Sequence, residues 1–238
     1  MFPSNFIKIL SDYKKAFIRD SKEKNHLYNN NYSQRMGDFS QKSLWKEEAS
    51  KAFEDIQISS NFRALDIGCN DGSGTEILSS LLDVSFEGID ISTAAIDSAH
   101  KNFPNKKDKF QTYDGENIPF LENSFDVICC MHVIGHVKNV KTFLSEIRRV
   151  MKPNGTVVII TPNAQYKIFS IVDSLMNNYN PDPTVRNYFF PKDFKDIAQS
   201  AGFNSVSTQR FGEKPLLLSW LPSESDYGRI RVILTATK

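Results

Sequence analysis

The sequence predicts an α/β protein in which a parallel sheet carries helices on both faces. From Asn61 onward, short apolar runs alternate with helical patterns, as they do where helices connect parallel strands. Runs such as "FDVICC" and "TVVIIT" are apolar at nearly every position, which is typical of strands buried on both faces. An acidic residue also ends each of the first three runs. Together these observations predict an open α/β sheet with polar side chains along one edge.

The 238-residue chain begins with a polar region, 1–60, for which we predict a helical cap. Apolar side chains recur there at helical spacing, and they are Trp45, Ala49, Ala52 and Phe53. This spacing predicts an amphipathic helix over roughly 40–56. The second region, 61–238, is predicted to form the sheet domain.

The sheet domain is predicted to contain successive strand and helix segments. The strand-like runs are "FRALDIG", "SFEGIDI", "KFQTYD", "FDVICCMHV" and "GTVVIITP". Helical patterns separate them, and Ser92 or Thr93 is a suitable cap for the second of these helices. After Thr161 the alternation stops, and about 163–190 is predicted to be an insertion that forms a lid.

The last part of the chain returns to the α/β pattern. "PKDFKDIAQSAGF" predicts a helix that begins at Pro191 and ends at Gly202, since Pro suits a first turn and Gly a helix end. "NSVSTQRF" and "RIRVILTATK" are predicted to be two closing strands.

Composition narrows the classes of function. The formal net charge is +1, so no overall field favours nucleic acid or an anionic membrane. We expect no membrane span and no signal peptide, because no apolar run is long enough. The three cysteines lack ligand spacing, which favours reduced thiols in a cytoplasmic protein over disulfides or a metal site.

The stretch "ALDIGCNDGSGTEIL" has the form of a nucleotide-binding loop between a strand and a helix. A phosphate-binding loop would need Gly-Lys five residues after Gly68, where Ser73 stands. A dinucleotide fingerprint starting at Gly72 and Gly74 would need glycine where Ile77 stands. The sequence therefore excludes both of these loop types.

A cationic cofactor suits this loop better. Asp66 ends the strand just before Gly68, where a carboxylate would repel a pyrophosphate but attract the sulfonium and ammonium of S-adenosylmethionine. Asn70 stands where such loops have a middle glycine, and Asn tolerates the left-handed conformation. Asp90 ends the second strand and can accept both ribose hydroxyls. Asp114 follows the third strand and can accept from the adenine amino group.

From about Phe62 to Phe211 the chain resembles the class I S-adenosylmethionine-dependent methyltransferases, especially the small-molecule branch that includes ubiquinone-type and sugar methyltransferases. The resemblance rests on "ALDIGCNDGSG", "GIDIS", "YDGENIPFLENSFDVICCMHVIGHV", "FLSEIRRVMKPNGTVVIITPN" and "FKDIAQSAGF". It implies a Rossmann-like sheet of seven mostly parallel strands, the last of them antiparallel. It also implies a set of cofactor-binding residues: Asp66, Gly68, Cys69, Asn70, Gly72, Asp90, Ile91, Asp114, Gly115 and Met131.

Two histidines are the candidate catalytic residues. The family often has Glu-His-Val where this chain has Gly135-His136-Val137, and His132 stands where the family is often acidic or small. Either histidine can serve as the base for a hydroxyl acceptor, and His136 is the favoured candidate because it matches the family's position. A structural role is an equally supported interpretation. A metal site is not expected, because no third acidic ligand is evident nearby.

The function predicted from the sequence is methyl transfer to a small molecule, at a hydroxyl of a sugar, nucleotide sugar or secondary metabolite. N-methylation of an amino sugar or related amine is one alternative, and a non-catalytic cofactor-binding subunit is another. Aromatic residues of the insertion and Arg186 are candidates for the acceptor pocket. Tyr28, Tyr32 and Arg35 are candidates for covering the cofactor. The oligomeric state, monomer or homodimer, stays open.

Overall fold

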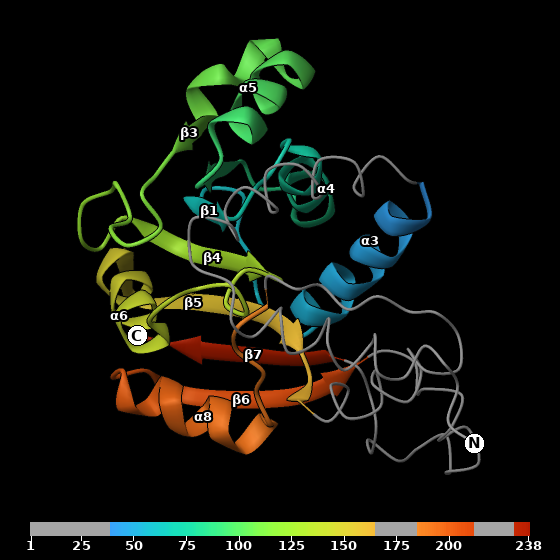
Figure 1. Cartoon of the computed structure of the whole chain (residues 1–238). Coiled ribbons are helices and arrows are strands. Elements are labelled where there is room, and N and C mark those ends of the chain that lie inside the picture. The colour runs from blue at the N-terminus through green and yellow to red at the C-terminus, as the bar shows by residue number, and fades with distance from the viewer. Residues whose placement is uncertain (1–38, 165–184, 212–230) are drawn as a thin grey trace, which may run out of the picture.

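The computed structural model describes residues 39–164, 185–211 and 231–238 (Figure 1). Its strands are β1 (Ala64–Ile67), β2 (Phe86–Asp90), β3 (Phe110–Thr112), β4 (Phe125–Met131), β5 (Met151–Pro162), β6 (Asn204–Phe211) and β7 (Arg231–Thr237). Its helices are α3 (Phe39–Phe53), α4 (Ser73–Leu82), α5 (Thr93–Asn102), the 3-10 helix η1 (Pro104–Lys109), α6 (Val140–Val150) and α8 (Pro191–Ser200).

The seven strands form one sheet in the order β3-β2-β1-β4-β5-β7-β6. Strands β1 to β5 pair in parallel, and β7 runs antiparallel to both β5 and β6. This arrangement confirms the predicted Rossmann-like sheet with an antiparallel last strand. From β1 the chain builds outward to β3 and then crosses back to β4, so the order reverses between β1 and β4. Ligands of open α/β sheets bind at such a reversal, beside the carboxyl ends of the strands.

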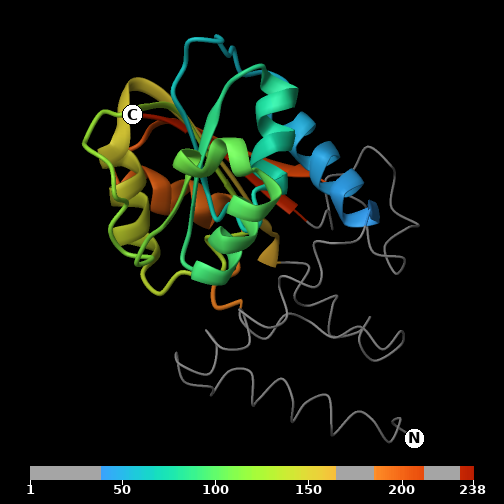
Figure 2. The same cartoon turned by 90° about the horizontal axis from the view of Figure 1, so that it is seen from above.

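Helices cover both faces of the sheet, as predicted. Buried side chains of α6 and α8 pack with Leu65, Ile128 and Cys130 on one face. Buried side chains of α3 and α4 pack with Ala64, Val127 and Cys129 on the other. Figure 2 shows α3 (blue) and α6 (yellow) on opposite sides of the sheet. The adjacent cysteines of β4 therefore point to opposite faces, where each is a buried packing group.

Local signals in the sequence set several helix ends. Ser92 caps α5, and its side chain accepts a hydrogen bond from Ala95 N. Pro191 begins α8, and Gly202 follows it with a φ of 92°. The helix predicted over 40–56 is α3, whose buried residues include Ala49, Ala52 and Phe53. In the described part of the chain, no helix has the length and apolarity that a membrane crossing requires.

The two ends of the predicted insertion lie side by side. Asn163 and Phe189 form a parallel bridge, and Ala164 N donates to Phe189 O at 2.9 Å. Residues 165–184 lie outside the described residues, as do 1–38 and 212–230.

Candidate functional site

The loop after β1 has the backbone that its residue types predict. Gly68, Asn70 and Gly72 all have positive φ, at 84°, 48° and 80°. The asparagine therefore takes the left-handed conformation where a middle glycine was expected, as its type allows. Gly68 N and Cys69 N both donate to Ile89 O, at 2.7 and 3.1 Å. These bonds hold the loop against the end of β2.

Asp90, at the end of β2, joins the loop after β1 to the loop after β2. Its Oδ2 accepts from Asn70 N at 3.0 Å, and its Oδ1 accepts from Ser92 N at 2.9 Å. Burial raises the pKa of this carboxyl, and the backbone N–H groups of Ser92 and Asn70 oppose the shift. A carboxylate has about four acceptor positions, so Asp90 retains capacity for the two ribose hydroxyls that its predicted role requires.

Asp66, in β1, is 3% exposed and sits beneath the same loop. Its Oδ2 accepts a hydrogen bond of 2.7 Å from the Thr75 hydroxyl. Burial raises the pKa of Asp66 to about 7; the bond from Thr75 lowers it and the charge of Asp90 raises it further. A cation that binds beside this carboxyl would favour its ionised form and pair with it.

The site residues fit S-adenosylmethionine on two further observations. The Asn70 Nδ2 group is buried, and no hydrogen-bond partner for it exists in the described part of the chain. A buried donor of this kind can be satisfied by an acceptor atom of a bound ligand. Ile91 is 44% exposed, and it lies so near Gly115 that a Cβ there would come within 3.1 Å of its Cγ2. An exposed apolar side chain beside a bare backbone suits the flat face of an adenine.

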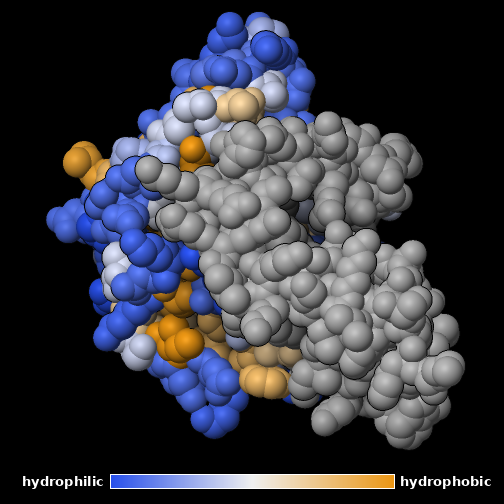
Figure 3. Space-filling model, viewed as in Figure 1, coloured by the Kyte–Doolittle hydropathy of each residue, from blue (hydrophilic) through white to orange (hydrophobic). Residues whose placement is uncertain are grey.

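Much of the described surface is hydrophilic in the view of Figure 3, particularly around α5. The exposed large hydrophobic residues among those described are Ile91, Leu121 and Phe190. Of these three, Ile91 belongs to the predicted cofactor site.

The predicted cofactor residues Asp114, Cys69 and Met131 differ in burial and in their contacts. Asp114 is exposed, and its carboxylate accepts from Glu116 N, Asn117 N and Asn117 Nδ2 within its own turn. These bonds hold the pKa of Asp114 below its usual value. The Cys69 side chain packs with Ile96, Ala99 and Phe110. Only the backbone of Cys69 is therefore left to face a cofactor. Met131 is buried at the end of β4.

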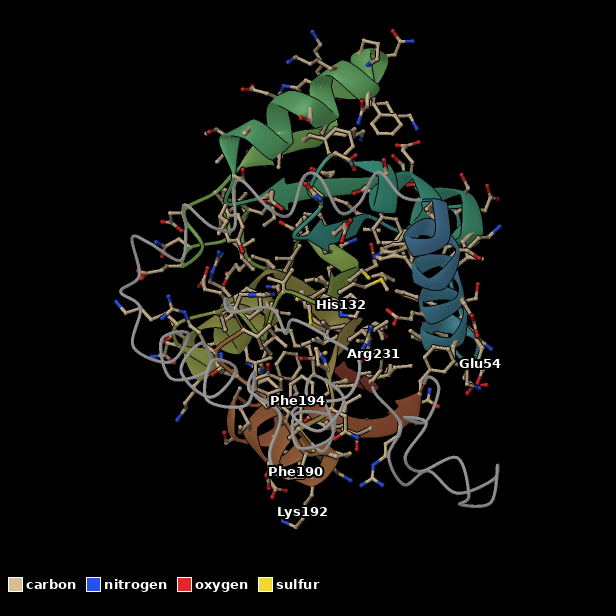
Figure 4. All side chains as sticks on the ribbon, turned by 45° about the vertical axis from the view of Figure 1, so that its right-hand side comes forward. Glu54, His132, Phe190, Lys192, Phe194 and Arg231 are labelled. Atoms are coloured by element: carbon tan, nitrogen blue, oxygen red, sulfur yellow. The ribbon has the colours of Figure 1, made fainter. Side chains whose placement is uncertain are left out.

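His132 is the first residue after β4, and its ring is held by a buried acid. It has a φ of 62°, and its N–H donates to Ile160 O at 2.8 Å. Its Nε2 lies 2.6 Å from Oε2 of Glu48 in α3, and Glu48 Oε1 accepts from Arg231 Nε at 2.8 Å. Figure 4 shows His132 and Arg231 close together beside α3. Sequence reasoning missed Glu48, although it lies three residues after Trp45 on the apolar face.

His136 lies in a turn that the exit of the insertion holds in place. His136 N donates to Val133 O at 2.8 Å. Gly135 O accepts from both Arg186 N and Asn187 N, and the Asn187 amide donates to Val137 O at 2.8 Å. Gly135, which departs from the family pattern, is thus closely surrounded by other residues. A Cβ at this position would come within 3.3 Å of Val185 and 3.4 Å of Asn187 O.

The predicted acceptor-pocket residues differ in how deeply they are buried. Phe189 is a core residue that stacks on Phe194 with ring centroids 4.5 Å apart, and Arg186 is exposed. Tyr188 is half-buried. Tyr166, Phe169 and Tyr179 lie outside the described residues, as do Tyr28, Tyr32 and Arg35. Trp45 packs on Gly74, where a Cβ would come within 2.9 Å of its ring.

Within the described ranges, no group of three or more His, Cys, Asp or Glu side chains is arranged to hold a metal ion. The two predicted histidines therefore have no metal-ligand set around them in this part of the chain.

Comparison with known proteins assigns the family. The methyltransferase domain family matches residues 28–208. The ubiquinone biosynthesis O-methyltransferase of Dictyostelium discoideum is 33% identical over 135 residues, which is 52% of this chain and 42% of that protein. Phosphoethanolamine N-methyltransferase 2 of Caenorhabditis elegans is 29% identical over 150 residues, 61% of this chain and 33% of that protein.

A SAM-dependent methyltransferase from Archaeoglobus fulgidus has a similar structure, with a TM-score of 0.64 and 20% identity. That match covers 83% of this chain and 94% of the other. The chain spans between 33% and 60% of the length of the first curated relatives that it matches. Because the family match covers most of the chain and the predicted loop has the expected geometry, the chain belongs to the methyltransferase domain family, in its class I, S-adenosylmethionine-dependent form.

Proposed function

We propose that this protein transfers the methyl group of S-adenosylmethionine to a hydroxyl of a small molecule, such as a sugar, nucleotide sugar or secondary metabolite. The observation that carries this proposal is the position of the two histidines. Val133, between them, would stand 2.1 Å from a Cβ on Gly68, so His132 and the turn with His136 lie directly beside the cofactor loop. Imidazole is a suitable base for a hydroxyl near neutral pH.

The residues of the site divide the work of the reaction. S-adenosylmethionine supplies a methyl group made electrophilic by its sulfonium. Asp66 provides negative charge for the cationic end, Asp90 accepts from the ribose, and Ile91 packs on the adenine. A histidine after β4 takes the acceptor proton as the new carbon–oxygen bond forms. Most of the rate enhancement then comes from holding the acceptor oxygen in line with the methyl group.

In this proposal the remaining regions enclose the cofactor and the acceptor. Residues 1–60 form a helical cap, of which α3 is the described part, and the insertion over about 163–190 covers the acceptor. The contacts of Arg186 and Asn187 with Gly135 support this arrangement, because they link the insertion to the turn that contains His136. The three buried free thiols support a cytoplasmic location.

N-methylation is the second candidate, and the similarity to a phosphoethanolamine N-methyltransferase favours it. A neutral amine already has a free electron pair, so it depends less on a general base than a hydroxyl does. A non-catalytic cofactor-binding subunit is the third candidate, and product formation with any acceptor excludes it.

The test is a screen of soluble metabolite pools with S-adenosylmethionine that is radiolabelled in its methyl group. Labelled product from a hydroxyl compound supports the proposal, and labelled amines favour the second candidate. With the acceptor found, His132→Ala and His136→Ala are compared by single-turnover kinetics beside their melting curves. Loss of a general base lowers turnover by about 100-fold or more while S-adenosylmethionine affinity stays intact. If both variants keep wild-type turnover, the histidine mechanism is wrong.

A further inference from the structure

A buried acid on the N-terminal helix contacts the first histidine of the site. Glu48 is 2% exposed, and it lies on the face of α3 that also presents Ala49 and Ala52 to the sheet. A carboxylate on an apolar helix face is rare unless it has partners. Glu48 has two, His132 on one oxygen and Arg231 on the other.

The partners keep Glu48 ionised. Burial alone would raise its pKa, but a protonated His132 and Arg231 together outweigh burial and hold the pKa below its usual value. When His132 is neutral, the cation Arg231 still lies on one carboxylate oxygen and the imidazole N–H on the other. An ionised carboxylate only accepts hydrogen bonds. The 2.6 Å contact therefore requires the hydrogen on Nε2 of His132.

This requirement determines the other ring nitrogen. In a neutral imidazole one nitrogen donates and the other accepts, so Nδ1 bears the lone pair. The His132 side chain is 20% exposed, whereas the Glu48 side chain is 3% exposed. Glu48 therefore holds the imidazole ring from the buried side. The backbone bond from His132 N to Ile160 O holds the main chain of His132 in place.

We propose that Glu48 is a positioning residue that keeps His132 in the Nε2–H tautomer, so that Nδ1 accepts the proton of the acceptor hydroxyl. This inference rests on the proposed O-methyl transfer. As the acceptor oxygen bonds to the methyl carbon, the carbon–sulfur bond breaks with its electron pair left on sulfur. The acceptor O–H proton moves to Nδ1. Glu48 stays ionised and stabilises the imidazolium that forms, as a buried carboxylate beside a catalytic histidine does.

Arg231 has a supporting part. It neutralises the charge of Glu48 when His132 is neutral, so the buried carboxylate is never without a cation or donor on either oxygen. The three residues come from α3, the end of β4 and the start of β7. These contacts link helix α3 directly to the edge of the sheet at which β4 ends.

The first experiment needs no acceptor. The imidazole nitrogens of the full-length protein are observed by 15N–1H NMR at a pH where the rings are neutral. The chain has four histidines, and the His132 signals are assigned by their loss in His132→Gln. We expect a protonated Nε2 and a lone-pair Nδ1 at His132. A protonated Nδ1 in the wild-type protein would overturn the proposal whatever reaction the protein catalyses.

The matched variants are Glu48→Gln and Glu47→Gln, which remove one carboxylate charge from adjacent positions of α3. Glu47 is exposed, so its variant should leave the His132 signals unchanged. Glu48→Gln should shift them toward a mixture of tautomers, because an amide can donate or accept. Signals that stay the same in a folded Glu48→Gln protein would show that Glu48 does not set the tautomer.

The second readout uses an acceptor identified by the screen. Glu48→Gln should lower kcat about 10-fold or more and leave the S-adenosylmethionine Kd unchanged, whereas Glu47→Gln changes neither. A purely structural tie between α3 and the sheet would lower Tm without this selective loss of kcat. If the tautomer is confirmed but kcat is unaffected, Nδ1 is not the proton acceptor and the inference fails while methyl transfer stands.

Discussion

Val133 lies against Gly68 so closely that a Cβ on Gly68 would stand 2.1 Å from Val133 Cγ2. The loop after β4 thus rests on the bare backbone of the loop after β1. Two features therefore require glycine at position 68: the close approach of Val133, and a φ of 84° that disfavours any side chain. The two chain segments that we assign to the cofactor and the acceptor meet at this contact.

Gly68→Ala is expected to destabilise the fold and weaken S-adenosylmethionine binding together. The free energy of unfolding should fall by about 2–5 kcal/mol, from about 1–2 for the left-handed backbone and about 1–3 for the clash. Thermal melts and calorimetric titration measure the two effects. Val133→Ala is the control, and it should relieve the clash but not the backbone strain. The double variant should therefore be more stable than the two single effects predict. Simple additivity would mean that the clash is absent.

Asp66 should make cofactor affinity depend on pH. Its pKa of about 7 means that it is partly protonated in the free protein near neutrality. A cationic ligand favours the ionised form, so affinity should rise as the pH increases through about 7. Calorimetry at several pH values between about 5.5 and 8.5, within which this carboxyl changes charge, tests this expectation. In Asp66→Asn the affinity should be weaker, and the part of the pH dependence due to this carboxyl should disappear.

The same carboxyl should affect stability with the opposite sign. Its pKa in the folded protein lies above the ordinary value of 3.8, so the folded chain binds a proton that the unfolded chain releases. The resulting stabilisation is present at acid pH and is lost as the pH rises from about 4 to about 7. Denaturant melts of the free protein should show this loss in the wild type and not in Asp66→Asn. Identical pH profiles for the two proteins would contradict the raised pKa.

Asp90→Ala should weaken S-adenosylmethionine binding by about 1–3 kcal/mol, because two ribose hydroxyls lose their acceptor. It should also lower Tm, since Asn70 N and Ser92 N lose theirs. Asp114→Ala is the comparison, because that carboxylate is exposed and bonds only within its own turn in the described structure. Its effect on Tm should be smaller. Unchanged calorimetric affinity in Asp90→Ala would remove Asp90 from the cofactor site.

The three thiols should be inert while the protein is folded. Cys69, Cys129 and Cys130 are free and buried, and burial raises the pKa of each well above its usual value. Because the thiolate is the reactive form, a colorimetric thiol reagent should modify none of them in the native state. All three should react after unfolding in denaturant. Rapid labelling of a cysteine in the native protein would disagree with this structure.

The sequence was sufficient to predict the sheet and the cofactor loop. Strand character, glycine positions and the acids at or near the ends of β1, β2 and β3 are local properties, and the carboxyl ends of parallel strands necessarily share an edge. Asn70 shows how far this reasoning extends: its tolerance of positive φ was predicted from its residue type, and its φ is 48°.

The contact between His132 and Glu48 could not be predicted in the same way. The two residues are 84 positions apart, and nothing in the spacing of either segment specifies the other. Only the packing of α3 on the sheet brings them together. The one local signal was an acid at a position that helical periodicity assigns to the buried face. Asp114 accepts hydrogen bonds within its own turn, and its contact with the adenine stays a prediction.

The bridge between Asn163 and Phe189 makes the intervening segment separable from the sheet. Since the ends of that segment are fixed side by side, its length can change at little entropic cost to loop closure. In the proposed arrangement this segment covers the acceptor, so mutations between the two ends would alter what meets the acceptor and leave the strands beside the cofactor loop unchanged. Substrate range could then evolve independently of the methyl-donor site, and the bridge offers a defined junction for exchanging this segment between related enzymes.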